Sequence, residues 1–189
     1  MKRWICGTWT AALLLVAASV AAQEASLTPA VPPLQAVPAL DLPRYLGRWY
    51  EVAKFPNRFQ RQCVADTQAD YSWQADGSLQ VRNRCRDAAG VMQEAVGQAR
   101  PLPGGLTSQL QVRFAPAWLS WLPWVWGDYW VIDLDADYQW VAISEPSREY
   151  LWVLSRSPQL AAPVYAALLQ RLRRQGLAVE RLEPTVQRP

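Results

Sequence analysis

The folded part of the chain opens with the stretch Asp41-Leu-Pro-Arg-Tyr-Leu-Gly47-Arg-Trp49-Tyr50-Glu-Val-Ala-Lys-Phe-Pro-Asn-Arg-Phe, which ends at residue 59. It predicts a first β-strand over residues 48–55. Ahead of it, residues 23–40 are small and repeatedly interrupted by proline, a composition that favours an extended linker over a packed element. We therefore expect one domain over residues 41–189.

Beyond this stretch, short segments alternate between apolar and polar side chains and are separated by turn residues. The clearest pair is a hairpin around Asp76-Gly77, in which Tyr71 lies before the turn and Val81 after it. Further strands are expected over residues 91–99, 109–114, 129–134, 139–144 and 150–156. Strands joined by short connections usually lie side by side. We therefore expect the all-β class and, within it, an eight-stranded antiparallel up-and-down barrel.

One helix is expected after the last strand. Leu160, Val164, Leu168 and Leu172 recur at helical spacing, arginines lie opposite them, and Gly176 provides the stop. This single amphipathic helix should pack on the outside of the barrel wall.

Composition limits the possible chemistry. The chain has 189 residues, 51% of them apolar and 19% charged, and it contains no histidine. Histidine-dependent nucleophiles and His-ligated zinc are therefore excluded, and a binding protein becomes the leading class. We expect no cofactor and no metal: Asp133, Asp135 and Asp137 resemble the start of a calcium loop, but Tyr138 and Ser144 occupy its glycine and glutamate positions.

The first 22 residues are typical of a secretory signal. Lys2 and Arg3 precede an apolar run over residues 11–22, which is shorter than the roughly 20 residues that span a bilayer. Cys6 lies ahead of this run and is not placed to receive the lipid of a bacterial lipoprotein. We expect export to the periplasm, with possible outer-membrane association. The mature chain would carry a net charge near +1, which does not favour nucleic-acid binding.

Three blocks of sequence together resemble the lipocalins, in particular bacterial lipocalins of the outer-membrane lipoprotein type. They are the opening stretch with its Gly47-x-Trp49-Tyr50, the turn Asp135-Ala-Asp137-Tyr138, and Tyr150-Leu-Trp-Val-Leu-Ser-Arg156. The resemblance covers about residues 41–186. It implies a ligand-binding barrel with a closed end and an open end.

Alternate connections of an up-and-down barrel lie at opposite ends, so the order of the strands, here called strand parity, assigns residues to one end or the other. These ends are called the floor and the mouth. Trp49, the turn at Asp135 and Tyr138, and Arg156 fall at the same end, together with Gly47. In lipocalins this end is the floor, and the resemblance implies that the Arg156 guanidinium packs over the Trp49 indole. We assign these residues a structural role.

At the mouth, parity places the cysteines that remain after the leader is removed, Cys63 and Cys85. In an exported protein the default for such a pair is a disulfide, although simple hairpin register sets them about four residues out of opposition. A loop that enters the second strand could correct this offset.

The mouth also receives residues 115–126, an uncharged segment with four tryptophans, Trp118, Trp121, Trp124 and Trp126. Two interpretations stay open. The tryptophans either fold over the mouth as a lid or anchor the protein in the membrane interface, where indole rings are favoured.

The function expected from these features is binding of an apolar ligand without covalent change. By resemblance, the ligand is a fatty acid, a lysophospholipid or a similar lipid, held for storage or transport in envelope maintenance, with its polar head at the mouth. Alternation suggests the wall positions Tyr71, Val81, Met92, Val112, Phe114, Trp130, Ile132 and Trp152.

Two alternatives come from other classes. An integral eight-stranded outer-membrane barrel predicts an aromatic C-terminal residue, whereas this chain ends in Pro189. An enzyme on a lipocalin-like barrel, acting on an isoprenoid or a pigment, would have to turn over its bound ligand without histidine.

Overall fold

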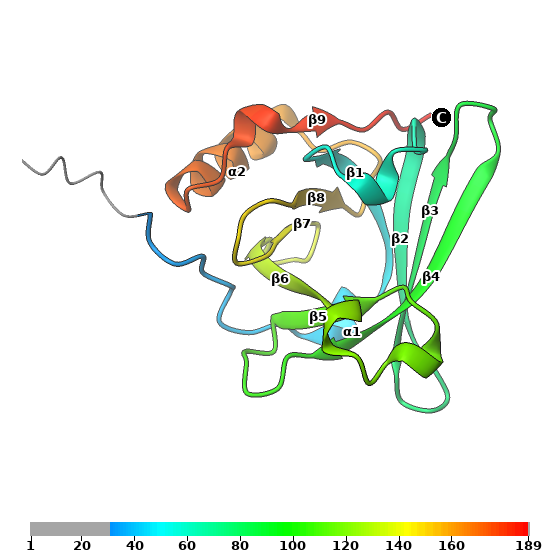
Figure 1. Cartoon of the computed structure of the whole chain (residues 1–189). Helices are drawn as coiled ribbons and strands as arrows, with labels where there is room; N and C mark the ends of the chain where they lie inside the picture. Colours follow the sequence, from blue (N-terminus) through cyan, green and yellow to red (C-terminus); the bar gives the residue numbers. More distant parts are fainter. Residues whose placement is uncertain (1–30, 189) are drawn as a thin grey trace, which may run out of the picture. The chain divides into compact units, whose positions relative to one another are not determined.

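The computed structural model describes residues 31–188 and contains a closed antiparallel β-barrel (Figure 1). Eight strands follow one another around the sheet, and the last, β8, pairs with β1, which also pairs with β2. Their bounds are β1 Gly47–Lys54, β2 Ala65–Trp73, β3 Leu79–Arg86, β4 Met92–Pro101, β5 Gln109–Arg113, β6 Gly127–Leu134, β7 Trp140–Ser144 and β8 Leu151–Ser155. The expected eight-stranded meander is confirmed.

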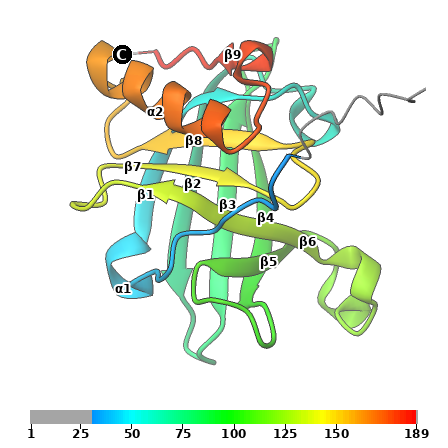
Figure 2. The ribbon, with the colours of Figure 1, turned by 90° about the vertical axis from the view of Figure 1, so that its left-hand side faces the viewer.

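The two ends of the barrel lie at the left and right of Figure 2. The floor carries the short helix α1 (Leu42–Tyr45) and the β6–β7 turn. The mouth carries the turn η1 (Arg58–Gln60), the β7–β8 connection and residues 115–126, which contain η2 (Ala117–Leu119) and η3 (Pro123–Val125).

The helix α1 was not expected from the sequence. Asp41 caps it by accepting a hydrogen bond from the backbone N–H of Arg44, and Pro43 occupies its first turn, where the missing N–H costs nothing. The chain then enters β1 through Gly47, whose φ of 89° favours glycine. This sharp entry carries Tyr45 into the barrel, where its side chain is fully buried.

The expected C-terminal helix is α2 (Ala162–Arg174), and Gly176 follows it with a φ of 79°. Leu168 and Leu172 point into an apolar layer between α2 and the outer face of the barrel. The strands β6, β7 and β8 supply Ile132, Trp140, Ala142, Leu151 and Val153 to this outer cluster. These three strands are therefore apolar on both faces.

The chain after α2 returns to the barrel wall. A second short turn, η4 (Val179–Arg181), leads to β9 (Glu183–Pro184), which pairs with β1 beyond the point where β2 leaves it. The Gln187 side chain then donates to the backbone carbonyls of Glu51 and Thr67, one on each side of the gap. The C-terminal segment thus closes a seam between β1 and β2.

Part of the expected linker is packed. Leu34 and Leu40 are buried, the Val37 N–H donates to the carbonyl of Val131, and the Leu40 N–H donates to Thr107 Oγ1. The apolar residues between the prolines allow this segment to add to the core, so packing begins before Asp41. The expected signal peptide, residues 1–22, and residues 23–30 lie outside the described residues.

Among residues 31–188, none of the helices is both long and apolar enough to cross a membrane.

The outer face of β2 and β3 carries ion pairs. Asp70 binds both Arg48 and Arg84, and Asp66 binds Arg86. The alternation read from the sequence is thus correct for this wall, where one face is polar.

Candidate functional site

The floor is closed by the pair predicted from the sequence. Trp49 is fully buried, and the guanidinium of Arg156 lies 3.8 Å from the centre of its ring. Arg156 also donates to the backbone carbonyls of Arg44 at 2.7 Å and Arg48 at 2.8 Å. The charged group therefore ties α1 and β1 to the end of β8, outside the ring that plugs the barrel.

The other predicted floor residues meet at the same place. Asp135 accepts two backbone N–H bonds within its turn, and the Tyr138 hydroxyl accepts the backbone N–H of Asp41. A Cβ on Gly47 would lie 3.5 Å from the Arg156 guanidinium. Asp133, by contrast, pairs with Arg171 of α2 at 2.6 Å, so it supports the helix.

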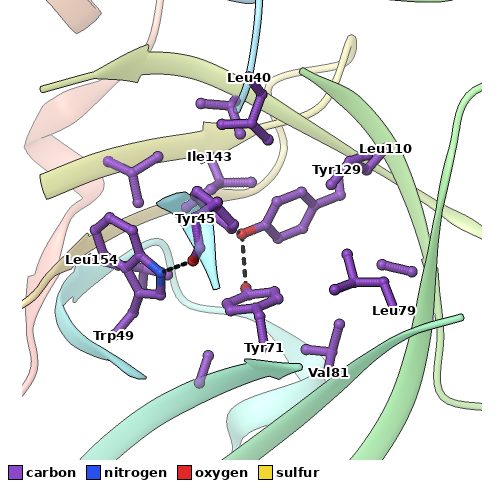
Figure 3. Packing of buried hydrophobic residues seen from close by; sticks show 14 of the residues in the cluster. Leu40, Tyr45, Trp49, Tyr71, Leu79, Val81, Leu110, Tyr129, Ile143 and Leu154 are labelled. Atoms are coloured by element: carbon purple, nitrogen blue, oxygen red, sulfur yellow. Dashed lines mark hydrogen bonds between the residues drawn. The ribbon is translucent and has the colours of Figure 1, made fainter. Parts of the chain in front are cut away.

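Above the floor, three tyrosines meet inside the barrel (Figure 3). The hydroxyl of Tyr129, from β6, lies 2.5 Å from that of Tyr45 and 2.8 Å from that of Tyr71, which comes from β2. Burial raises the pKa of Tyr71 to about 12 and raises the pKa values of Tyr45 and Tyr129 well above normal. The three phenols, here called the tyrosine cluster, are therefore neutral at physiological pH.

Sequence reasoning found only Tyr71 of this cluster. Tyr45 was missed because α1 was missed. Tyr129 was missed because residues 129–132 are all apolar or aromatic, and alternation alone does not show which of two apolar faces points inward.

The inward-facing residues of β3 and β4 differ in exposure between the floor and the mouth. On β3 and β4, the inward-facing Leu79 and Ala99 near the floor are buried, whereas Ala95 and Gln93 near the mouth are exposed. The upper half of β4 pairs only with β3, because β5 contacts β4 only from Gln98 onward. The lower part of the barrel interior is thus filled by side chains, whereas the inward-facing residues of β4 near the mouth are exposed; this interior is here called the cup.

Of the eight predicted wall positions, four point into the barrel: Tyr71, Val81, Val112 and Trp152. Phe114 also lies on the inner side, at the rim, where its ring occupies the space that a Cβ on Gly97 would need. The structure brings these five residues together around the cup.

The other three wall positions are corrected. Trp130 and Ile132 face outward and pack in the cluster beneath α2. Their strand is apolar on both faces because the helix covers its outer side, and Tyr129 and Val131 point inward instead. Met92 pairs with the outward-facing Arg86, so it lies on the outer side of the β3–β4 hairpin.

A buried carboxyl group lies beside the cup and was also missed. Glu51 is 2% exposed and accepts hydrogen bonds from Gln60 Nε2 at 2.6 Å and Thr185 Oγ1 at 2.5 Å. Burial raises its pKa, against the lowering effect of these bonds and of Lys54. Gln60 in turn accepts from Trp152 Nε1 at 2.8 Å, which links the seam to the cup wall.

The disulfide predicted at the mouth is present. Cys63 and Cys85 are bonded, with their Cα atoms 5.4 Å apart. The offset in register is absorbed by an irregularity between Ala65 and Gln68 in β2 and by the turn in which Cys63 lies. The bond fastens the β1–β2 connection to the end of β3.

The tryptophans of residues 115–126 divide into two groups. Trp118, Trp121 and Trp124 are 73%, 76% and 75% exposed. Trp126 is half-buried: its ring lies 3.8 Å from the guanidinium of Arg100, and its Nε1 donates to the carbonyl of Ser120. The segment, here called the tryptophan loop, therefore holds three indoles away from the barrel and does not fold them over the mouth as a lid.

Two hollows lie along the side of the barrel where β4 meets β5. One, of about 370 Å³, is lined by Leu79, Ala99 and Leu110 near the floor and reaches Trp126. The other, of about 290 Å³, lies beside Gly97 and Phe114 under the start of the tryptophan loop. Packing on this side is thus looser than on the side covered by α2.

Comparisons of sequence agree on the family. A family model described as a lipocalin-like domain matches residues 40–187. The chain is 38% identical over 157 residues to temperature-induced lipocalin-1 of Arabidopsis thaliana, which covers 82% of this chain and 83% of the relative. It is 34% identical over 173 residues to the outer membrane lipoprotein Blc of Escherichia coli K12, which covers 91% of this chain and 89% of the relative.

Comparison of structures gives the same fold. Insecticyanin from the tobacco hornworm Manduca sexta aligns with a TM-score of 0.64 at 18% identity, over 82% of this chain and 84% of that chain. With the closed barrel, the single C-terminal helix and the Trp49–Arg156 floor, these matches show that the chain belongs to the lipocalin family.

Proposed function

We propose that this protein binds a lipid, such as a fatty acid or a lysophospholipid, in the open part of its barrel and stores or carries it during envelope maintenance. Lipocalins bind small hydrophobic ligands. The observation that supports the proposal is the apolar barrel interior, which is closed by Trp49 at the floor and lined by Val81, Val112 and Trp152. Removing an acyl chain from water stabilises such a complex by about 0.8 kcal/mol per methylene.

The expected location supports this role. Relatives named Blc are outer membrane lipoproteins, which suggests an exported, envelope location. A periplasmic position, reached through the leader, belongs to the proposal. Lipocalin relatives are generally binding and transport proteins, and we propose no reaction for the cup.

Ligand titration tests the proposal. The protein is delipidated and titrated with palmitic acid while its intrinsic tryptophan emission is recorded. Because Trp152 lines the cup, a saturable change at one equivalent of ligand is expected. Absence of any saturable change with fatty acids and lysophospholipids would contradict lipid binding.

We further propose that the tryptophan loop contacts a bilayer at the mouth. Three exposed indoles and no charged residue over residues 115–126 suit the headgroup region, where tryptophan is favoured. The anchoring of Trp126 by Arg100 keeps the loop in place while the other three indoles project. Loading from a membrane would then bring lipid directly to the open end of the cup.

Flotation with phosphatidylcholine vesicles tests the contact. Replacing Trp118, Trp121 and Trp124 together with Ser is expected to abolish most vesicle association. Trp73→Ser is the matched control, since Trp73 is 47% exposed but lies at the floor end. Equal association of the triple variant and the wild type would end the docking idea while leaving ligand binding intact.

A further inference from the structure

We propose that the hollow beneath the start of the tryptophan loop is an anion-binding site, where Arg113 binds the phosphate of a phospholipid headgroup when the loop contacts a bilayer. The inference rests on the membrane contact proposed above and deepens it, because it adds a charged group to a loop that has none. Arg113 lies on the outer face of β5, so this site is distinct from the binding of an acyl chain in the cup.

The position of Arg113 follows from the strand register. It pairs with Gln98 of β4, and the preceding residue of β5, Val112, packs against the inner core, so Arg113 points to the outer side. The beginning of the tryptophan loop covers it there, and its guanidinium lies 5.2 Å from the centre of the Trp126 ring. Only 4% of the residue remains exposed. The loop therefore buries a positive charge.

This charge has no counter-ion. The guanidinium of Arg113 donates to two neutral oxygens, the backbone carbonyl of Ala115 and Oε1 of Gln98. Its Nε–H is buried without an acceptor. Among residues 31–188, Arg113 takes part in no ion pair. A buried charge that lacks a counter-ion is costly, so an anion beside Arg113 would stabilise the site.

The hollow next to this charge provides space for a ligand. It has a volume of about 290 Å³ and lies where β5 separates from β4. Of the described residues that line it, Arg113 alone is charged. Gln80 and Gln98 contribute side-chain amides, and because the oxygen of Gln98 accepts from Arg113, its N–H₂ group is left to donate to a ligand. The hollow thus offers an anion both room and hydrogen-bond donors.

Acidic side chains on the same outer wall have other partners. Glu94 of β4 lies 3.7 Å from Arg82, and Asp128 of β6 accepts a hydrogen bond from Gln111 at 3.2 Å. Neither forms an ion pair with Arg113. The described residues therefore leave the place of a counter-ion to a ligand.

The loop itself points to the source of the anion. Its exposed indoles begin at Trp118, directly after the lining residues Pro116 and Ala117, and Figure 2 shows the loop projecting from the barrel beside β6. Indole rings favour the headgroup region of a bilayer, where the phosphate groups of phospholipids also lie. Two phosphate oxygens match the planar guanidinium, which can donate two parallel N–H bonds. Contact of the loop with a bilayer would thus bring headgroup phosphate to the hollow.

Vesicle flotation tests the site with Arg113→Gln and a matched control, Arg82→Gln. Arg82 lies on the same outer wall, but its side chain is 46% exposed and paired with Glu94. With vesicles of phosphatidylcholine mixed with phosphatidylglycerol, we expect Arg113→Gln to bind about tenfold more weakly than wild type, the loss typical of one hydrogen bond to a charged group. Arg82→Gln should change binding by less than about twofold, because salt screens exposed charges.

A measurement on the wild-type protein keeps the inference testable if Arg113→Gln does not fold. The arginine side chains are labelled with ¹⁵N, and the Nε–H signal of Arg113 is followed by NMR during a titration. Dihexanoylphosphatidylglycerol is expected to shift this signal saturably. Dihexanoylglycerol, which has the same acyl chains but no phosphate, is expected to leave it unchanged. Inorganic phosphate is titrated in parallel.

The possible outcomes are distinct. Vesicle binding by Arg113→Gln that matches that of Arg82→Gln, or an Arg113 signal that does not respond to the phospholipid, overturns the anion site and leaves the membrane contact in place. A shift caused by inorganic phosphate at lower concentration than by the phospholipid overturns the assignment to a headgroup. If the wild type binds neither the mixed vesicles nor pure phosphatidylcholine vesicles, the proposed membrane contact fails, and this inference fails with it.

Discussion

The same pair of side chains occurs at the floor and at the base of the tryptophan loop, with different consequences. At the floor, Arg156 lies 3.8 Å from the ring of a fully buried Trp49; at the base of the loop, Arg100 lies 3.8 Å from the ring of a half-buried Trp126. The first pair is surrounded by the inner core and closes the barrel. The second lies on the outer face and fixes the base of a loop.

Equal geometry therefore does not mean equal energy. The indole of Trp49 loses all its contact with water, whereas that of Trp126 keeps part of it, and burial of apolar area dominates such contributions. Cation–π attraction itself adds only about 0.5–2 kcal/mol at either end. We therefore expect Trp49 to contribute more to stability than Trp126 does.

The largest effect is expected for Trp49→Ala. Removing this buried ring leaves a cavity in the inner core and should lower the free energy of unfolding by about 3–5 kcal/mol. Trp126→Ala, the matched change at the mouth, should cost about 1 kcal/mol. Urea unfolding followed by circular dichroism measures both. Similar losses in the two variants would contradict the contrast between the ends.

The next largest loss of stability is expected when the Cys63–Cys85 disulfide at the mouth is removed. The double substitution Cys63→Ser with Cys85→Ser removes a bridge between residues 22 positions apart, which should cost about 3 kcal/mol on the chain-entropy model. The same loss should follow when the wild type is unfolded in the presence of a reductant. If the reduced protein kept its full stability, the mouth would have to be held by its other contacts alone.

A smaller, pH-dependent effect is expected at the seam between the two ends. Because burial raises the pKa of Glu51 in the folded protein, folding takes up a proton there, and this contribution to stability is lost as pH rises above the unfolded value of about 4.3. Glu51→Gln removes the titration. Its stability relative to wild type should therefore increase between pH 4 and pH 8.

Denaturation midpoints at several pH values give this difference. Glu94→Gln is the control for loss of a carboxylate as such, because this carboxylate is exposed and lies 3.7 Å from Arg82. A profile of Glu51→Gln no steeper than that of Glu94→Gln would contradict the raised pKa of the buried carboxyl group.

The smallest effect on stability is expected for the triple change of Trp118, Trp121 and Trp124 to Ser. These indoles are largely exposed, so the free energy of unfolding should change by less than about 0.5 kcal/mol. Thermal unfolding checks this. A large loss of stability would show that the loop supports the barrel and would weaken its assignment to membrane contact.

Much of the fold was predictable because its signals are local. The alternation around Asp76-Gly77 fixed the β2–β3 hairpin, and the parity of the strands placed Trp49 and Arg156 at the same end. The candidate site was less predictable. Trp130 and Ile132 were assigned to the wrong face, because alternation identifies the inner side only where the other side is polar.

The sequence by itself determined the meander and the shared end of Trp49 and Arg156, since these depend on short-range pattern and on the order of the strands. Only the tertiary structure decided which aromatic residues meet inside the barrel. Tyr45 enters from α1, and Tyr71 and Tyr129 from opposite walls, so their hydroxyls become neighbours across 84 and 58 positions of sequence. Hydrogen bonds over such separations arise from closure of the barrel, which no local pattern encodes.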